Sequence, residues 1–206
     1  MTRLYAASAA AFVCVLMAGA AWLAFAGRGN DPYADCRTGV VSGGAGSIGG
    51  PFTLVNGAGA TVTDQQVFTK PSLLYFGFTF CPDVCPVDNA RNAEAVDILQ
   101  EQGFDVAPVF ITVDPARDTA QVMADYAANM HPEMIALTGT AEQTKAAVEA
   151  YRGYFKLPAD VSGDYAVDHS TFTYLVLPQK GFVEFFRREV TADQMAEKTG
   201  CFLSRG

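Results

Sequence analysis

Apolar and polar residues along this chain follow three successive patterns. Residues 4–27 form an apolar block without a charged side chain, residues 28–50 become glycine-rich, and from Pro51 onward short apolar runs alternate with amphipathic ones. The glycine-rich stretch has no apolar period, which is typical of a tether. The patterns therefore predict three parts: an N-terminal segment over residues 1–27, a tether over 28–50 and a folded domain over 51–206.

Within the domain, the pattern predicts strands that alternate with helices. Strands are expected at residues 52–55, 60–63, 73–80, 106–113, 171–177 and 182–187, and helices at about 86–102 and from Thr119, Thr140 and Thr191. The runs at 73–80 and 106–113 are apolar throughout, and a helix joins them, which predicts a parallel pair buried on both faces. The last two strands form a hairpin, and a final helix follows. This order is typical of a thioredoxin-like α/β fold.

The N-terminal block has the length of a membrane span. Its 24 residues would extend about 36 Å as a helix, more than the roughly 30 Å of a bilayer core. We expect one N-terminal transmembrane helix that anchors the chain, with the domain facing the periplasm or the equivalent extracytoplasmic space, because Arg3 precedes the span. A cleaved secretory signal is the alternative, since Ala24-Phe25-Ala26 resembles a cleavage site.

Composition and charge narrow the function classes. The formal net charge is −8, and Arg3 is the single charged residue of positions 1–27, so the rest of the chain is more acidic still. An acidic surface repels phosphate backbones, which excludes nucleic-acid binding. The many aromatic and β-branched residues exclude intrinsic disorder.

The five cysteines fall into three groups. Cys14 lies in the apolar block and is expected to be a small apolar filler. Cys36 and Cys201 lie near opposite ends of the remaining chain, where they form either a disulfide or two unrelated free thiols. Cys81 and Cys85 stand together between a buried strand and the first long helix.

The Cys81 and Cys85 pair points to thiol chemistry. Four residues apart on a helical turn, the two side chains share one face. The partial positive charge of a helix N-terminus is expected to lower the pKa of both thiols and to favour thiolate. Two thiolates on one face make either a metal clamp or a redox dithiol, and the alternative is a buried unreactive pair.

His169 is the candidate third member of this site. It follows Asp168 at the start of the predicted hairpin, which a thioredoxin-type sheet would place beside the cysteine loop. Two thiolates and one imidazole form a soft three-ligand set that suits Cu(I) and is one short of the four ligands of structural zinc. His131 fits a structural place at a helix C-terminus. Core packing is expected for Met123, Met130 and Met134.

Three segments resemble the Sco/SenC family of copper-binding assembly proteins. They are LLYFGFTFCPDVCP at residues 73–86, VDPARDT at 113–119 and VDHS at 167–170, in matching order and spacing over about residues 50–200. The resemblance implies a thioredoxin-like domain that binds copper, as Cu(I) with Cu(II) left open, through Cys81, Cys85 and His169. The implied partners are the dinuclear copper site of cytochrome c oxidase subunit II, an upstream copper donor and, through the N-terminal helix, the membrane.

The VDPARDT segment allows two interpretations. Arg117 pairs with a nearby carboxylate and shapes the site, or the segment is a strand-end turn in which Asp118 helps to cap the helix from Thr119. The pair Cys36 and Cys201 departs from the simplest family pattern, and reactive thiols there would put a two-thiol exchange scheme in doubt.

Three functions are consistent with these residues. The first is a membrane-anchored copper metallochaperone, and the second is a membrane-anchored thiol–disulfide oxidoreductase in which Cys81 and Cys85 are catalytic. The third is a peroxidase or redox sensor. The Cys-x-x-x-Cys spacing with a convergent histidine favours the first, because redox thioredoxins use Cys-x-x-Cys and need no imidazole ligand.

Overall fold

The computed structural model describes residues 13–22, 32–37, 45–161 and 163–205. The chain divides into two compact units, Met1–Asp35 and Cys36–Gly206. Of the predicted membrane span, residues 13–22 form a helix and the rest lies outside the described residues. Among the described helices, none combines the length and the apolar character that crossing a bilayer requires.

The second unit is built on a seven-stranded mixed sheet with the strand order β2-β1-β5-β4-β3-β8-β9. β3, β4 and β5 run parallel, whereas β1 and β8 flank them antiparallel. The strands are β1 (Thr53–Asn56), β2 (Thr61–Thr63), β3 (Ser72–Gly77), β4 (Ala107–Thr112), β5 (Ile135–Thr138), β8 (Thr173–Leu177) and β9 (Gly181–Phe186). Every residue of β3, β4 and β8 is buried, as expected of central strands that are covered on both faces.

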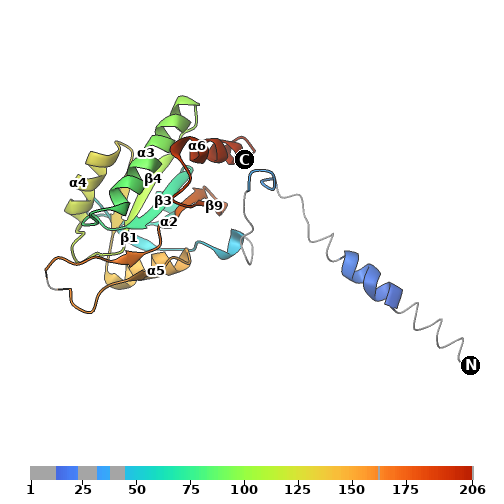
Figure 1. Ribbon diagram of the computed structural model, residues 1–206, viewed down its shortest axis with the longest axis horizontal. Helices are drawn as coiled ribbons and strands as arrows, with labels where there is room; N and C mark the ends of the chain where they lie inside the picture. Colours follow the sequence, from blue (N-terminus) through green and yellow to red (C-terminus); the bar gives the residue numbers. More distant parts are fainter. Residues whose placement is uncertain (1–12, 23–31, 38–44, 162, 206) are drawn as a thin grey trace, which may run out of the picture. The chain divides into compact units, whose positions relative to one another are not determined.

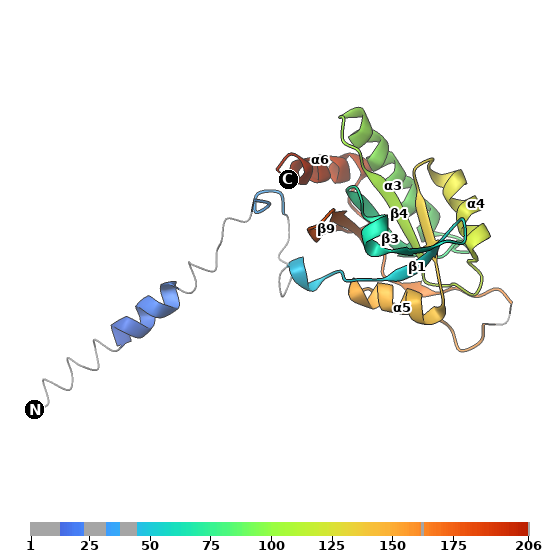
Figure 2. The same ribbon diagram turned by 180° about the vertical axis from the view of Figure 1, so that it is seen from behind.

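Helices cover both faces of this sheet. α3, α4 and α6 lie on one face and α5 on the other (Figures 1 and 2). The helices are α2 (Asp64–Val67), α3 (Val84–Glu101), α4 (Ala120–Met130), α5 (Ala141–Ala150) and α6 (Ala192–Leu203), and a short 3-10 helix, η1, spans Ala45–Ser47. α3 and α4 share a face because successive crossovers of one hand progress in one direction across the sheet. The expected thioredoxin-like α/β arrangement is confirmed.

The predicted elements agree with the structure except near the cysteine loop and in a few short pieces. Thr119, Thr140 and Thr191 each cap a helix through a side-chain oxygen that accepts a backbone N–H, as the sequence predicts. The strand predicted to run to Phe80 ends at Gly77, and α3 begins at Val84 rather than at Pro86. The short elements α2, β5, β6 and β7 were not predicted, because two to four residues carry too little periodicity to be recognised.

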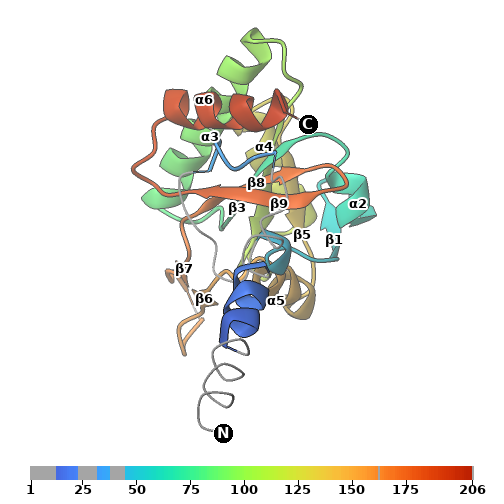
Figure 3. The same ribbon diagram turned by 90° about the vertical axis from the view of Figure 1, so that its right-hand side faces the viewer.

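A second, two-stranded sheet lies apart from the main one (Figure 3). It pairs β6 (Phe155–Lys156) with β7 (Asp168–His169), and Phe155 lies opposite His169. The prediction that His169 begins the β8–β9 hairpin is therefore wrong, since three residues separate β7 from β8. A pairing of two residues is too short to leave a clear period-2 signal in the sequence.

The N-terminal part of the second unit is tied to its last helix. Cys36 and Cys201 form a disulfide with a Cα–Cα distance of 5.7 Å, so the bridged alternative is the one present. Of the tether predicted over residues 28–50, residues 28–31 and 38–44 lie outside the described residues. Near the end of the predicted tether, Gly49 donates its backbone N–H to Ala150 O at the end of α5 (2.8 Å).

Candidate metal centre

Cys81 and Cys85 lie at the junction between β3 and α3. Cys85 is the second residue of α3 and is fully buried, whereas Cys81 precedes the helix and is 9% exposed. The backbone N–H of Cys85 donates to Cys81 Sγ (3.4 Å), which holds the first sulfur over the start of the helix. Gly77 leaves room for the second sulfur, since a Cβ there would lie 2.9 Å from Cys85 Sγ.

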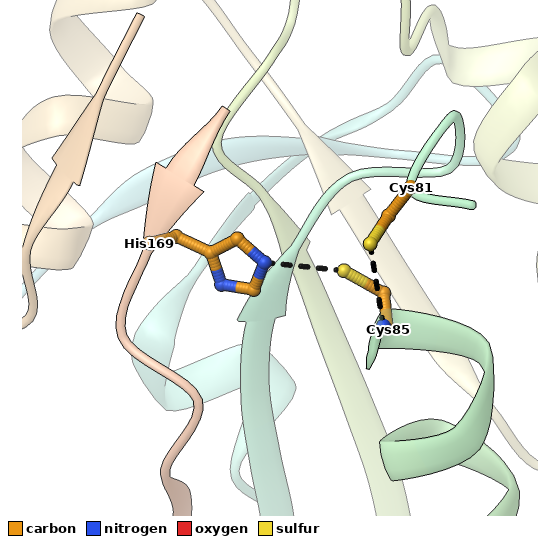
Figure 4. Close-up of side chains that lie close together, drawn as sticks. All are labelled: Cys81, Cys85 and His169. Atoms are coloured by element: carbon orange, nitrogen blue, oxygen red, sulfur yellow. Dashed lines mark hydrogen bonds between the residues drawn. The ribbon is translucent and has the colours of Figure 1, made fainter. Parts of the chain in front are cut away.

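His169 reaches the thiols from β7. Its ring points toward Cys85, and its Nε2 lies 3.2 Å from Cys85 Sγ (Figure 4). Its other nitrogen, Nδ1, lies 2.9 Å from the backbone oxygen of Ser170. A carbonyl can only accept, so Nδ1 carries the proton and Nε2 presents a lone pair to the sulfur.

The structure thus brings together the three residues that the sequence singles out. Cys81 Sγ, Cys85 Sγ and a ring nitrogen of His169 all lie within 4.8 Å of one another. Among the described residues, this is the one group of at least three histidine, cysteine or acidic side chains close enough to hold a metal ion. Two thiols and an imidazole are soft donors, which select Cu(I) or zinc over hard cations.

The two thiols differ in acidity, which corrects the expectation that the helix N-terminus lowers the pKa of both. Burial strongly raises the pKa of the Cys85 thiol, with the neighbouring Cys81 acting in the same direction. At Cys81 burial also acts upward, but hydrogen bonds from the backbone N–H groups of Cys85, Asp83 and Val84 together hold its pKa below the usual value. Cys81 is therefore the sulfur that ionises first.

The protonation state of His169 complements this order. Burial lowers the pKa of His169, so the ring is neutral near pH 7. Neutral Nε2 accepts the Sγ–H of Cys85, which keeps a proton on the buried sulfur while no metal is bound. A soft metal ion that displaces this proton would find a thiolate and a ring nitrogen already directed at it.

A buried carboxylate holds the loop that leads into Cys81. Asp118 is fully buried and accepts hydrogen bonds from the backbone N–H of Thr79 (3.0 Å) and from the hydroxyls of Thr79 and Thr112. The alternative in which Asp118 caps α4 is wrong, because Thr119 Oγ1 accepts the N–H of Val122 instead. This role joins three distant segments, which no local pattern in the sequence shows.

The other interpretation of the VDPARDT segment is confirmed in its first part. Arg117 pairs with Asp114, its Nε donating to Asp114 Oδ2 at 2.5 Å. The guanidinium also stacks on Tyr165, with 3.5 Å between its carbon and the ring centroid. Tyr165 was not among the residues predicted from the sequence, where its place four residues before His169 is the one available signal.

The remaining candidates lie away from the metal centre. His131 ends α4 as expected, with its Nε2 3.2 Å from Asp97 Oδ1 on α3. Packing in or against the core is confirmed for the three methionines, Met123, Met130 and Met134. Cys14 is an exposed free thiol in the first unit, and the disulfide removes Cys36 and Cys201 from the free thiols.

Proteins of one family match this chain in both sequence and fold. A family model described as SCO1/SenC matches residues 41–204. Protein SenC of Rhodobacter capsulatus is 50% identical over 96% of this chain and 89% of its own length. The crystal structure of Arabidopsis thaliana ScoI with copper bound superposes with a TM-score of 0.72, at 40% identity over 76% of this chain and 99% of that one.

Coverage differs among the relatives. The mitochondrial SCO1 homolog 1 of Arabidopsis thaliana is 42% identical over 76% of this chain. The match spans 47%, about half, of that homolog's own length. All three matches include most of the thioredoxin-like domain.

Proposed function

This chain belongs to the SCO1/SenC family, and from that premise we propose that it is a copper metallochaperone that carries Cu(I) on Cys81, Cys85 and His169. The family takes part in the copper assembly of cytochrome c oxidase. One observation carries the proposal: two thiols from the β3–α3 junction and one imidazole nitrogen from β7 lie within 4.8 Å of one another. Copper is the cargo of such a site.

Each residue has a distinct part in loading. Cys81 has the lower thiol pKa and a place outside the helix, so it offers the first thiolate. Cys85 follows, and its proton leaves for solvent when the metal takes its place between Sγ and His169 Nε2. The hydrogen bond from Nδ1 to Ser170 O holds the imidazole in the orientation that binding needs.

Three ligands also suit release. A site with three protein donors leaves a coordination position open, so a ligand from a partner can bind before one of these donors departs. The partner that we propose is the subunit II copper domain of cytochrome c oxidase, with an upstream copper donor that loads the chain. We also propose that residues 1–27 anchor the chain in a membrane, on the length and apolar character of residues 4–27, with the domain on the extracytoplasmic side.

A thiol–disulfide oxidoreductase is the second candidate. Its support is the asymmetry of the thiols, since a low-pKa Cys81 beside a buried Cys85 has the form of an attacking and a resolving cysteine. Reduction of a partner disulfide would oxidise Cys81 and Cys85 to a disulfide and leave two thiols on the partner. This function does not explain why His169 lies against Cys85.

The deciding experiment measures what reaches the partner. Copper-loaded protein is mixed with subunit II copper domain whose cysteines are already reduced, and the metal on each protein is measured after separation. Pre-reduction removes the thiol-exchange role, so we expect copper on subunit II. Copper that stays on this chain, together with reduction of oxidised subunit II by the apo protein, would favour the oxidoreductase.

Matched variants connect the transfer to the proposed ligands. Cys81→Ser or Cys85→Ser replaces a soft donor by a hard one and should abolish stable Cu(I) binding. His169→Ala leaves two thiolates, which retain Cu(I), so it should weaken Cu(II) binding more than Cu(I) binding. His131→Ala is the control, because this second histidine lies against Asp97 and outside the group. If His169→Ala retains Cu(I) and Cu(II) equally well, His169 is not a ligand of the site.

A further inference from the structure

We propose that Tyr165, held by Asp114 and Arg117, positions His169 against the two thiols. We call Asp114, Arg117 and Tyr165 the clasp. The clasp joins the segment at residues 113–119 to Tyr165, which lies four residues before His169. The inference rests on the proposed function only in that His169 is taken as a metal ligand.

His169 belongs to a segment whose side chains alternate strictly. Tyr165, Val167 and His169 face the protein, whereas Asp164, Ala166 and Asp168 are exposed. In an extended chain such side chains share one face. The position of the Tyr165 side chain against the protein therefore determines where the His169 side chain lies. A slip by one residue would turn the imidazole outward.

The clasp fixes Tyr165 in both direction and depth. Tyr165 Oη donates to Asp114 Oδ1 (2.9 Å), and the Arg117 guanidinium carbon lies 3.5 Å from the ring centroid. Asp114 is itself held, because its backbone N–H donates to Thr112 Oγ1 (2.9 Å) at the end of β4, and Arg117 pairs with its second carboxylate oxygen. Asp114 and most of Arg117 are buried, so the ion pair between them is shielded from solvent.

Arg117 also contacts the segment that carries the cysteines. Its guanidinium carbon lies 5.6 Å from the ring centroid of Phe78 and 5.0 Å from that of Phe80, the residue next to Cys81. Phe78 in turn meets the His169 ring edge-on, with centroids 5.8 Å apart. One guanidinium therefore spans the two segments that supply the sulfurs and the imidazole.

The other supports of His169 do not set its position as tightly. β7 pairs with β6 through only two residue pairs, and a two-residue ladder is marginal on its own. Val167 is buried in the core, but an apolar contact has no preferred direction and tolerates small shifts. The hydrogen bond from Nδ1 to Ser170 O orients the ring, but Ser170 belongs to the same segment and does not anchor it to the β4–α4 connection. The clasp supplies that directional anchor, which makes Tyr165 a positioning residue for His169.

The first test uses the reduced full chain without copper. With the clasp intact, His169 covers Cys85, which is fully buried. Tyr165→Ala removes both the hydrogen bond and the stacking, so iodoacetamide should alkylate Cys85 about tenfold faster at fixed pH. Tyr165→Phe keeps the stacking, so its rate should fall between the two. Tyr154→Ala is the matched control, because this tyrosine precedes β6 with its side chain 57% exposed.

The second test couples Tyr165 to His169. Tyr165→Ala should weaken Cu(II) binding and shift the Cu(II) electron paramagnetic resonance spectrum toward that of His169→Ala. In the His169→Ala background it should change neither, because a positioning residue acts only through the group that it positions. Circular dichroism establishes folding of each variant, and if Tyr165→Ala does not fold, Tyr165→Phe takes its place in the comparison.

The outcomes separate the two proposals. If His169→Ala itself leaves Cu(II) binding unchanged, the ligand assignment of the proposed function fails. If His169→Ala weakens Cu(II) binding while Tyr165→Ala matches Tyr154→Ala in both tests, the ligand assignment stands and the clasp is refuted. An equal loss from Tyr165→Ala with and without His169 would also refute it, because the effect would then be general destabilisation.

Discussion

Removal of the disulfide between Cys36 and Cys201 tests how the second unit is stabilised. The cross-link closes a chain segment with a sequence separation of 165. In the chain-entropy model, a loop of this length lowers the entropy of the unfolded state enough to stabilise the fold by about 5 kcal/mol. Measured losses are usually smaller, so the double variant Cys36→Ser, Cys201→Ser should lose about 2–5 kcal/mol of unfolding free energy.

Urea unfolding of the full chain measures this loss. The m-value should rise as well, because the variant's unfolded chain is freed from the cross-link and exposes more surface. Cys14→Ser is the matched control, since it replaces a free thiol in the first unit. Copper binding should persist in the double variant, because neither bridged cysteine belongs to the metal-binding group.

Two results would refute this reasoning. A loss below about 1 kcal/mol with an unchanged m-value would show that the cross-link does little to restrict the unfolded chain. Unchanged stability with lost copper binding would show that Cys36 and Cys201 act as functional thiols rather than as a structural bridge.

Two further predictions concern ionisable groups at the metal centre. The pKa of Cys81 is lowered and that of Cys85 is raised, so iodoacetamide should begin to modify Cys81 at a lower pH than Cys85. Mass spectrometry should find Cys85 protected throughout. Equal pH profiles for the two thiols would contradict the assigned acidities. Burial raises the pKa of Asp118, so its protonation favours the folded state at acidic pH and this contribution fades as the pH rises through the folded pKa. Asp118→Asn should flatten that part of the stability–pH curve. Asp118→Ala leaves the Thr79 donors unpaired, so it should lower the unfolding free energy measured in urea by about 2–4 kcal/mol. An Asp118→Ala variant as stable as the parent would disprove the role of this carboxylate.

The sequence by itself was sufficient for the order of the longer elements, with the exception of β5, and for the identity of the metal-binding candidates. Continuous apolar runs marked β3 and β4, because strands covered on both faces have no polar side to alternate with. Threonines with a glutamine three residues later marked α5 and α6, because a capping box is a local device. Cys81 and Cys85 stood out for the same reason, because they are only four residues apart in the sequence.

The distances and acidities were decided only by tertiary structure. His169 lies 84 residues from Cys85, in a strand, β7, whose pairing with β6 the sequence did not predict. The thiol pKa values diverge because Cys85 is buried among other elements while backbone N–H groups face Cys81, and the helix terminus alone does not distinguish them. Asp118 and Tyr165 contribute through contacts that span 39 and 51 residues, respectively, and contacts at such separations leave no periodic trace in the sequence.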